Sequence, residues 1–329
     1  MIITKTPFRM SFFGGGTDLP EFFNEYGGAV LSTTFDKYCY VNVRHLPRFF
    51  DYSTELSYSI IERVKDIDRI KHPAIRNAMK MLKMHEIRLT YEADLPARSG
   101  LGTSSSFAVG MLNAFYALKG KYVDKKELAT KAIYLERELC REKGGWQDQV
   151  AASFGGLNII TFNQDGFNVN PVIIRPERKK ELNNNLLMFF TGFTRYSSEI
   201  LGKNNDIDKT KQLLEMKQLV NEAKNILTNK NSDLRDFGKL LDYSWQLKQR
   251  TGHNITNDDI NRLYQKGIQA GAIGGKLLGA GGGGFLLFYV EPDKQMKVKS
   301  ALKDLLFIPF EFENIGTQVL YYKAEDYEM

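Results

Sequence analysis

Residues 95–106 most constrain what this chain can fold into. They read LPARSGLGTSSS and connect a segment of alternating apolar and polar residues, at 87–93, to an apolar segment of helical spacing, at about 104–118. Gly100 and Gly102 permit backbone angles and close approaches that a side chain forbids. Backbone amides in such a turn, together with the positive end of the following helix, can bind one anion. The sequence therefore predicts a phosphate-binding turn between a strand and a helix, with a simple Gly/Ser helix cap as the alternative.

The hydroxyl groups of this loop extend the prediction. Thr103, Ser104, Ser105 and Ser106 can contact phosphate oxygens or a magnesium ion. The segment is neither GxxxxGK[ST] nor GxGxxG, which excludes a Walker loop and the dinucleotide fingerprint.

A second glycine motif, PFRMSFFGGGTD, spans residues 7–18. Its three consecutive glycines let a ligand lie against the backbone. Asp18 can accept hydrogen bonds from sugar hydroxyls, and Arg9 can bind phosphate or orient a carboxylate. A tight turn with a capping aspartate is the alternative interpretation.

The third motif is a glycine cluster near the C-terminus, GGKLLGAGGGGF at residues 274–285. Seven of the eleven residues 274–284 are glycine, which a pair of strands does not require and which costs stability. Close backbone approach to a ligand or to the phosphate loop would explain the cluster. A flexible linker is the alternative.

Length and composition place limits on the function. The 329 residues suit two domains, which we divide at 1–178 and 179–329 within a polar stretch at 175–185. A net charge of +6 without a basic block gives little support for a nucleic-acid partner. Two cysteines outside any metal-ligand pattern, no apolar stretch of membrane-spanning length and no signal-peptide core indicate a cytoplasmic protein without a membrane partner.

Periodicity indicates that both halves mix strands and helices. We expect strands at residues 2–6, 29–44, 87–93, 155–162, 186–190, 285–290 and 318–322. We expect helices at residues 73–84, 104–118, 125–141, 208–249 with a break near 229–232, and 293–306, and a further helix with Thr256 as its N-cap.

Taken together, the three motifs resemble the signature of the GHMP kinase superfamily, which includes galactokinase, homoserine kinase, mevalonate kinase and phosphomevalonate kinase. Residues 96–106 resemble its P-x-x-x-G-L-G-S-S loop, with Thr103 in place of the first serine. The spacing from Arg9 to Asp18 matches the first galactokinase motif, except that Gly15 and Gly16 stand where galactokinases have Glu-His. GGWQDQ at residues 144–149 resembles the family's catalytic-aspartate element, in the form that heptose-phosphate kinases and bacterial fucokinases have.

The resemblance implies catalytic, nucleotide and metal residues. Asp148 would accept the proton of the attacking hydroxyl or orient that hydroxyl, with Arg9 beside it. Ser104 and Glu136 would hold magnesium; Glu138, two residues further along, is the competitor for that position. The residues implied to bind ATP are Pro96, Ser99, Gly100, Leu101, Gly102, Thr103, Ser104, Ser105 and Ser106.

The acceptor site is predicted from residues that flank the motifs. The candidates for binding the sugar are Gly15, Gly16, Thr17, Asp18, Gln147, Arg195, Gly281 and Gly282. The candidate cations for a phosphate on the sugar are Arg98, Lys143, Arg195 and Lys276.

The resemblance further implies an α+β fold of two domains, an N-terminal ribosomal-protein-S5-like domain and a C-terminal ferredoxin-like domain. The implied reaction is transfer of phosphate from ATP, with Mg²⁺, to the anomeric hydroxyl of D-glycero-D-manno-heptose 7-phosphate, by a monomer or homodimer. Another sugar kinase, such as a fucokinase or galactokinase, is the nearest alternative. A non-catalytic sugar or nucleotide sensor and an RNA-binding α+β protein are alternatives of other classes.

Overall fold

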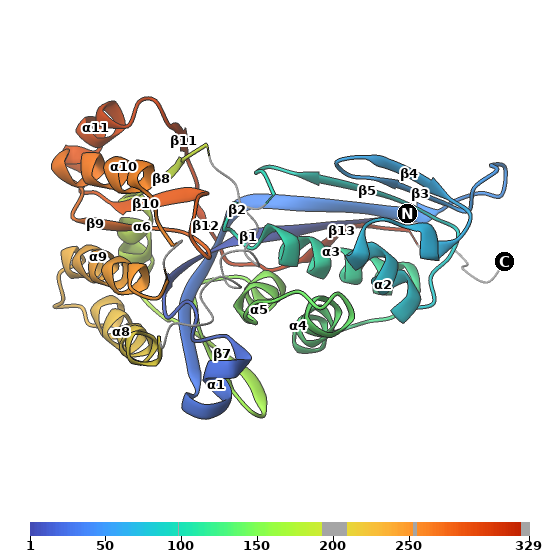
Figure 1. Cartoon of the computed structure of the whole chain (residues 1–329), viewed down its shortest axis with the longest axis horizontal. Coiled ribbons are helices and arrows are strands. Elements are labelled where there is room, and N and C mark those ends of the chain that lie inside the picture. Colours follow the sequence, from blue (N-terminus) through green and yellow to red (C-terminus); the bar gives the residue numbers. More distant parts are fainter. Residues whose placement is uncertain (98, 193–208, 253–254, 324–329) are drawn as a thin grey trace.

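The computed structural model describes residues 1–97, 99–192, 209–252 and 255–323, which form a nine-stranded and a four-stranded sheet with helices packed against both (Figure 1). The elements of the first half are β1 (Ile2–Phe13), α1 (Pro20–Tyr26), β2 (Gly28–His45), β3 (Thr54–Ser57), β4 (Ile61–Val64), a 3-10 turn (Ile67–Arg69), α2 (Pro73–Met81), β5 (Ile87–Ala93), α3 (Thr103–Leu118), α4 (Lys125–Tyr134), a π-helical turn (Leu135–Leu139), α5 (Gln147–Phe154), β6 (Asn158–Asn163) and β7 (Gly166–Pro171). Those of the second half are α6 (Pro176–Asn184), β8 (Leu186–Phe190), α8 (Thr210–Thr228), α9 (Arg235–Gln249), α10 (Asp258–Gln269), β9 (Gly274–Leu277), β10 (Phe285–Tyr289), α11 (Pro292–Ala301), β11 (Leu306–Ile308), β12 (Phe312–Glu313) and β13 (Gln318–Tyr322). The expected two-domain α+β class is confirmed.

The larger sheet is organised around the long strand β2. Its main path runs β13-β1-β2-β5-β3-β4, and β2 pairs with β5 through its C-terminal part and with β6 through its N-terminal part. Helices α2, α3, α4 and α5 lie on one face of this sheet (Figure 1). The apolar side chains of β1, β2 and β5 that face them form a buried core with α2 and α3.

Helix α3 lies directly on β1, and a glycine makes this possible. A Cβ atom on Gly110 would lie 2.6 Å from the Thr6 hydroxyl oxygen, so any side chain would push the helix off the strand. The Thr4 hydroxyl donates a hydrogen bond of 2.9 Å to the Gly110 carbonyl, and Ser106 donates one of 2.9 Å to the Pro7 carbonyl. These contacts set the first turn of α3 beside the middle of β1.

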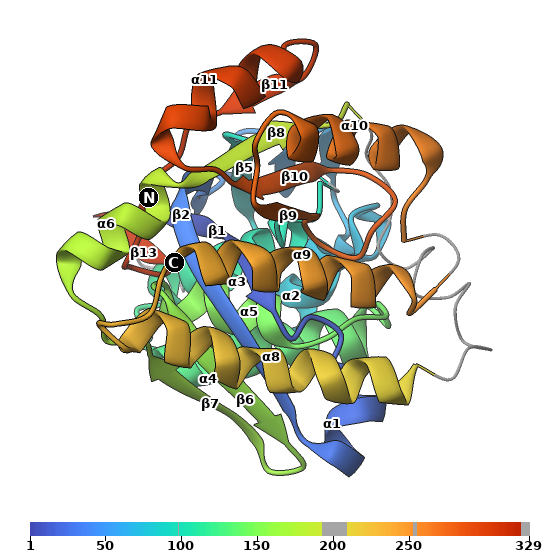
Figure 2. The ribbon, with the colours of Figure 1, turned by 90° about the vertical axis from the view of Figure 1, so that its left-hand side faces the viewer.

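The smaller sheet has the antiparallel order β11-β8-β10-β9. Along β10 the side chains alternate between two cores because successive residues of a strand point to opposite faces. Leu286 and Phe288 belong to a core with α10 and α11, whereas Phe285 and Leu287 belong to a core with α8, α9 and the first half of the chain. Figure 2 shows α8 and α9 side by side below this sheet, with α10 and α11 above it.

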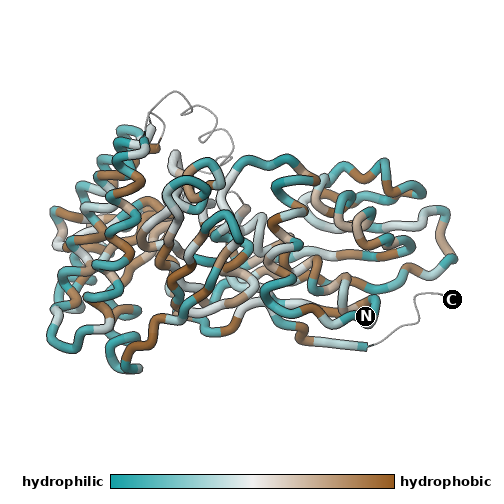
Figure 3. Tube along the Cα trace, turned by 90° about the horizontal axis from the view of Figure 1, so that it is seen from below, coloured by the Kyte–Doolittle hydropathy of each residue, from teal (hydrophilic) through white to brown (hydrophobic). Residues whose placement is uncertain are grey.

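The two halves of the chain share one buried core. The ring of Phe237 on α9 packs edge-on against Phe12 and Phe13 of β1, with centroid distances of 5.3 and 5.1 Å. Strands β12 and β13, near the end of the described chain, pair with β2 and β1 of the larger sheet. The division at residues 178 and 179 stays a prediction; the polar stretch around it forms α6. Hydrophilic and hydrophobic residues alternate within the turns of the helices, as burial of one helix face requires (Figure 3).

Most expected elements are confirmed, and several differ in extent. The helices expected at 73–84 and 293–306 end at Met81 and Ala301, and the strand expected at 155–162 begins at Asn158. The first strand continues past Pro7 to Phe13; the β1–β2 register shifts at Pro7/Phe8, an irregularity of the kind at which sheets accommodate proline. The helix expected at 125–141 ends at Tyr134 and continues as a π-helical turn. The expected N-cap Thr256 is wrong: the Asn257 side chain accepts the amide of Ile260 at 2.9 Å, so α10 begins one residue later. No helix among the described residues is long and apolar enough to cross a bilayer.

Candidate active site

The centre of the candidate site is an ion pair between Arg9 on β1 and Asp148 in the first turn of α5. Both Nε and Nη2 of Arg9 lie 2.8 Å from Oδ1 of Asp148, and the Arg9 Nη1 donates to the Gly100 carbonyl at 2.7 Å. Oδ2 of Asp148 lies beside Gly102, where a Cβ atom would be 3.2 Å from it. The guanidinium thus ties the carboxylate to the glycine loop, and Oδ2 receives no hydrogen bond from Arg9.

The predicted phosphate loop adopts the backbone that its glycines permit. The φ angle is +85° at Gly100 and +72° at Gly102, which is the N-cap of α3. Because the first turn of a helix leaves amides without intrahelical carbonyl partners, the start of α3 presents N–H groups to a ligand. Ser99 is buried and donates to the Pro96 carbonyl at 2.8 Å, which stabilises the turn. Arg98 lies outside the described residues.

The C-terminal glycine cluster packs directly on this loop. A Cβ atom on Gly279 would lie 2.3 Å from the Cα of Gly100, and one on Gly284 would lie 2.1 Å from the Ser99 carbonyl oxygen. This close backbone approach to the phosphate loop explains the cluster. Gly281 and Gly282 instead contact Ile255, whose carbonyl accepts the Gly282 amide at 2.9 Å.

Glu136, the predicted magnesium residue, lies buried beneath the start of α3. Its Oε2 accepts hydrogen bonds from the Ser105 hydroxyl at 2.8 Å and from the Gln149 side-chain amide. Burial raises the pKa of the Glu136 carboxyl. Ser104, the residue predicted to share the magnesium ion with Glu136, is exposed in the first turn of α3, and Glu138 is exposed as well. The structure therefore brings Glu136 next to Ser105 and leaves Ser104 facing outward.

Asp18 is buried under the turn that precedes α5. Its carboxylate accepts the amide of Gly16 at 3.0 Å and that of Gln147 at 3.2 Å. A Cβ atom on Gly145 would lie 1.8 Å from Oδ2 of Asp18, so this glycine is required for the turn to close over the carboxylate. Burial, and secondarily the charge of Asp148, raises the pKa of Asp18. The two carboxylates are therefore electrostatic neighbours.

The other predicted acceptor residues divide into two groups. Gly15 and Gln147 lie close together: a Cβ on Gly15 would be 4.0 Å from the Gln147 Nε2 and 3.9 Å from the Ser11 hydroxyl oxygen. Ser11 Oγ and Gln147 Oε1 are buried without a hydrogen-bond partner among the described residues. The Thr17 hydroxyl is instead used internally: it lies 2.8 and 2.9 Å from the Gly14 and Ala29 carbonyl oxygens, which share its one proton, and it accepts the Ala29 amide at 3.0 Å. The remaining predicted residues are Gly16, in the same turn with φ at +98°, and Arg195, outside the described residues.

Two lysines complete the charged part of the site. Lys276 of β9, one of the candidate cations, is 3% exposed and donates to the Phe12 carbonyl at 2.6 Å. Lys248 of α9 donates to the Gly279 carbonyl, and sequence reasoning missed it. Burial, and secondarily the positive charge of Arg9, lowers the pKa of Lys248 to about 8. Lys143, by contrast, is exposed.

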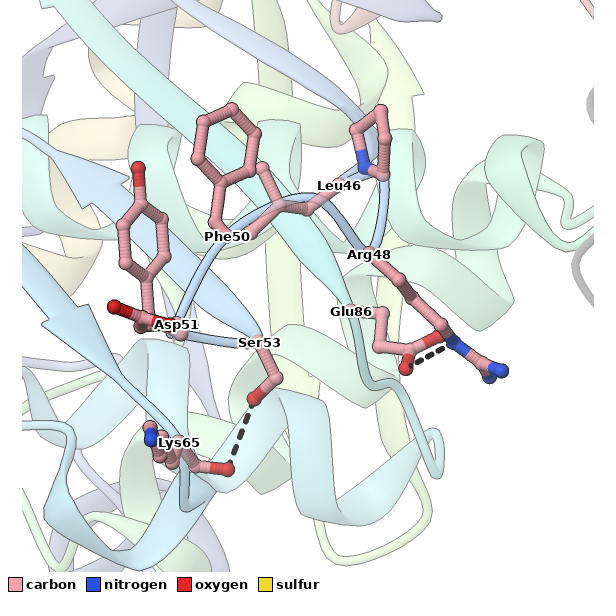
Figure 4. A pocket seen from close by; sticks show the side chains of 9 residues that line it. Leu46, Arg48, Phe50, Asp51, Ser53, Lys65 and Glu86 are labelled. Carbon is pink, nitrogen blue, oxygen red and sulfur yellow. Dashed lines mark hydrogen bonds and ion pairs between the residues drawn. The ribbon is translucent and has the colours of Figure 1, made fainter.

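A surface pocket elsewhere in the molecule is separate from this site. It lies in the connection between β2 and β3, where Phe50 and Lys65 line it and Arg48 pairs with Glu86 at 2.7 Å (Figure 4). Strands β3 and β4 lie at the end of the larger sheet away from the smaller sheet (Figure 1). The pocket shares no residue with the glycine loop.

An amide-lined loop at a helix start, with an arginine-held carboxylate beside it, defines a phosphotransferase site. Comparison with known proteins agrees. The family model described as GHMP kinases N terminal domain matches residues 68–156, and the one described as GHMP kinases C terminal matches residues 219–306. The chain belongs to the GHMP kinase family, whose members use ATP as the phosphate donor.

Individual relatives extend this similarity over almost the whole chain. A D-glycero-alpha-D-manno-heptose 7-phosphate kinase from Campylobacter jejuni is 32% identical, over 92% of this chain and 93% of its own. A galactokinase from Pyrococcus furiosus is 25% identical over 92% of both chains. The crystal structure of a D-glycero-D-manno-heptose 1-phosphate kinase from Bacteroides thetaiotaomicron superimposes with a TM-score of 0.80 at 24% identity, covering 98% of this chain and 100% of that one.

Proposed function

We propose that this protein phosphorylates the anomeric hydroxyl of D-glycero-D-manno-heptose 7-phosphate, giving the 1,7-bisphosphate. The observation that carries the proposal is the Asp148 carboxylate, fixed by Arg9 next to the amide-lined loop. The choice of heptose 7-phosphate is supported by the 32% identity to the C. jejuni enzyme of that name and by the Gly-rich form of residues 14–16.

The carboxylate has the geometry of a group that receives a proton. Oδ1 is occupied by the arginine, so Oδ2, beside Gly102, is the oxygen that would accept the hydroxyl proton of the sugar. The same arginine would stabilise negative charge on the phosphoryl group during transfer. A general acid–base group of this kind contributes a factor of about 100 or more to turnover.

The nucleotide would bind with its terminal phosphates against the turn at residues 99–106. Gly100 and Gly102 keep the backbone open, and the amides at the start of α3 would donate hydrogen bonds to phosphate oxygens. Little covalent chemistry is then required of the protein, because alignment of the hydroxyl with the γ-phosphorus supplies much of the rate.

Magnesium is proposed as the metal cofactor, with Glu136 and the serines at the start of α3 as its protein contacts. The site fits the ion: a buried carboxylate whose Oε2 is bonded to Ser105, with Ser104 exposed one residue earlier. No group of three or more acidic, His or Cys ligands gathers within the described residues, which suits an ion that takes most of its ligands from phosphate and water. These residues would hold the ion, and its chemical contribution when bound would be to offset negative charge on the nucleotide phosphates.

The sugar would lie between the Gly14–Gly16 turn and the start of α5. Ser11 and Gln147 hold buried oxygen atoms without partners among the described residues, and the Asp18 carboxylate retains lone pairs beyond its two amide contacts. Buried polar atoms of this kind are ordinarily satisfied, so a polyhydroxylated ligand accounts for them. Gly281 and Gly282 would border the same space from the second half.

The test is ATP turnover on heptose 7-phosphate, fucose, galactose and mannose, with the wild type beside Asp148→Asn. ADP release identifies the substrate, and ³¹P NMR of the product identifies the phosphorylated oxygen. Preferred turnover of fucose or galactose would assign a different sugar kinase activity. Galactose is the more important alternative substrate to test, because one relative over 92% of the chain is a galactokinase. No turnover on any sugar, with ATP binding retained, would favour a non-catalytic sensor.

A further inference from the structure

Two lysine side chains, Lys276 buried and Lys248 partly buried, flank the candidate site without a carboxylate partner among the described residues. Lys276 Nζ donates to the Phe12 carbonyl at 2.6 Å, and Lys248 Nζ donates to the Gly279 carbonyl. An ammonium group has three N–H donors, so each lysine keeps donors beyond its carbonyl contact. Neither lysine forms an ion pair in the part of the chain that the structure describes.

The electrostatic balance of the cluster is positive. Three cations, Arg9, Lys248 and Lys276, lie close enough to influence one another, against two carboxylates, Asp18 and Asp148. Asp148 is paired with Arg9, and Asp18 is held by two backbone amides. Burial, followed by the charges of Lys248 and Arg9, lowers the pKa of Lys276 well below its ordinary value.

Placing these lysines in or near the protein interior lowers the stability of the fold unless an anion binds to them. A buried ammonium without a counter-ion destabilises a fold, and an apolar side chain of similar length would avoid that cost. Packing alone therefore does not explain two lysines in the adjacent elements α9 and β9. A ligand that carries negative charge does.

We propose that Lys248 and Lys276 together bind a phosphate ester that the acceptor sugar already carries. This deepens the proposed function and rests on it. ATP also carries phosphate groups, so the two lysines could bind either the phosphate of the sugar or a phosphate of ATP.

The positions of the two lysines favour the acceptor. In the proposed function the α3 amides and Arg9 would serve the transferring phosphate, on the Gly100–Gly102 side. Lys276 contacts Phe12, at the end of β1 that leads into the Gly14–Asp18 turn. Lys276 thus borders the sugar side of the site, where an acceptor phosphate distant from the reacting hydroxyl would lie. Lys248 lies at Gly279, next to the glycine loop, and would reach the same phosphate from there.

The experiment compares D-glycero-D-manno-heptose 7-phosphate with the same heptose lacking the phosphate, in the wild type, Lys248→Met and Lys276→Met. Steady-state KM values for each sugar and for ATP are measured, together with direct calorimetric binding of heptose 7-phosphate. Lys239→Met is the matched control, because Lys239 lies on the same helix as Lys248 and forms only an exposed pair with Asp236.

We expect KM and Kd for heptose 7-phosphate to rise roughly 10- to 100-fold in each lysine variant, the effect of losing a hydrogen bond to a charged group. KM for ATP and KM for the unphosphorylated heptose should stay within about twofold of the wild-type values, a change that corresponds to less than about 0.5 kcal/mol. Lys276→Arg keeps the positive charge and should retain most of the binding of heptose 7-phosphate. Thermal melting identifies any variant that fails to fold. If Lys276→Met does not fold, Lys248→Met tests the inference, because Lys248 is partly exposed.

Each contrary result has a distinct meaning. A rise in KM for ATP alone assigns the lysines to the nucleotide and overturns the inference. Turnover of heptose 7-phosphate with unchanged KM in both variants overturns the inference and leaves the proposed function intact. Lysine-dependent binding of heptose 7-phosphate without turnover supports the inference and overturns the proposed function, and neither binding nor turnover overturns both.

Discussion

The guanidinium of Arg9 and the carboxylate of Asp148 form a two-pronged ion pair, with Nε and Nη2 each 2.8 Å from Oδ1, although 139 residues separate them. The side chains are 6% and 24% exposed, so the pair is shielded on the arginine side and open on the carboxylate side. This geometry leaves Oδ2 for a ligand and connects the carboxylate to the glycine loop through the Gly100 carbonyl.

Replacing Asp148 by asparagine tests the proton acceptor. The change keeps the shape of the side chain and removes its basicity, so kcat should fall by at least about 100-fold while the Kd for ATP changes little. Single-turnover phosphate transfer and calorimetric ATP binding measure the two quantities. Asp165→Asn, in the exposed turn between β6 and β7, is the control and should leave both unchanged. Retained turnover in Asp148→Asn would eliminate the assignment.

Replacing Arg9 by lysine tests the two-pronged contact. Lysine keeps the charge but cannot contact Asp148 and Gly100 with a planar fork, so we expect a loss in kcat of roughly 10-fold or more. The double variant with Asp148→Asn should lose little more than Asp148→Asn alone, because coupled residues are non-additive. Arg63→Lys, at an exposed pair with Glu55, is the matched control. Fully additive losses would show that the two residues act separately.

Gly279→Ala tests the contact between the glycine cluster and the phosphate loop. The new Cβ would lie 2.3 Å from the Gly100 Cα at a φ of +81°, so we expect a stability loss of about 1–3 kcal/mol and a raised KM for ATP. Gly120→Ala separates the two effects, since its φ is +64° and no atom lies within 4 Å. Chemical denaturation and ATP kinetics are the measurements. Equal effects in both variants would show that backbone strain alone matters.

Glu136→Gln tests the magnesium proposal. The amide keeps the size of the side chain and removes its charge, so the Mg²⁺ concentration for half-maximal activity should rise roughly 10-fold or more. A magnesium titration of turnover at saturating ATP measures this change. Glu138→Gln, two residues along and exposed, should titrate like the wild type. An unchanged titration in Glu136→Gln would remove this residue from the metal site.

The lowered pKa of Lys248 predicts a pH dependence of stability. Burial holds its pKa at about 8 in the folded protein, while an unfolded lysine titrates near 10.4. Between these values the unfolded state binds more protons, so stability rises with pH through that window and is pH-independent below it, as far as this group is concerned. The free energy of unfolding of the wild type relative to Lys248→Met should therefore increase from about pH 8 to about pH 10.4. If the difference in unfolding free energy between wild type and Lys248→Met does not change with pH, the pKa of Lys248 is not lowered in the folded protein.

Much of the candidate site was predicted because glycine motifs have local causes. Gly100 and Gly102 adopt positive φ angles that other residues avoid, and their place between β5 and α3 can be deduced from periodicity alone. Lys248 could not be found in this way, because a lysine on an amphipathic helix is ordinarily exposed. Only the packing of α9 against β9 buries it beside the glycine cluster.

The direct hydrogen bond between Glu136 and Ser105 was also not predicted, for a similar reason; that Glu136 and Ser104 share a magnesium ion stays a prediction. Which hydroxyl meets the carboxylate depends on the rotation of α3 and on the π-helical turn that carries Glu136, and the π turn shifts the helical register. Residue spacing assumes a regular helix and cannot detect this shift.

The sequence by itself determined the family, the α+β class and the three backbone turns, since these depend on residues that are neighbours in the chain. The tertiary structure decided which groups meet: Arg9 with Asp148, Gly279 with Gly100, and Lys276 with the end of β1. Contacts across such separations depend on strand order and on how closely helices pack, and both are set by burial of the shared core rather than by local preference.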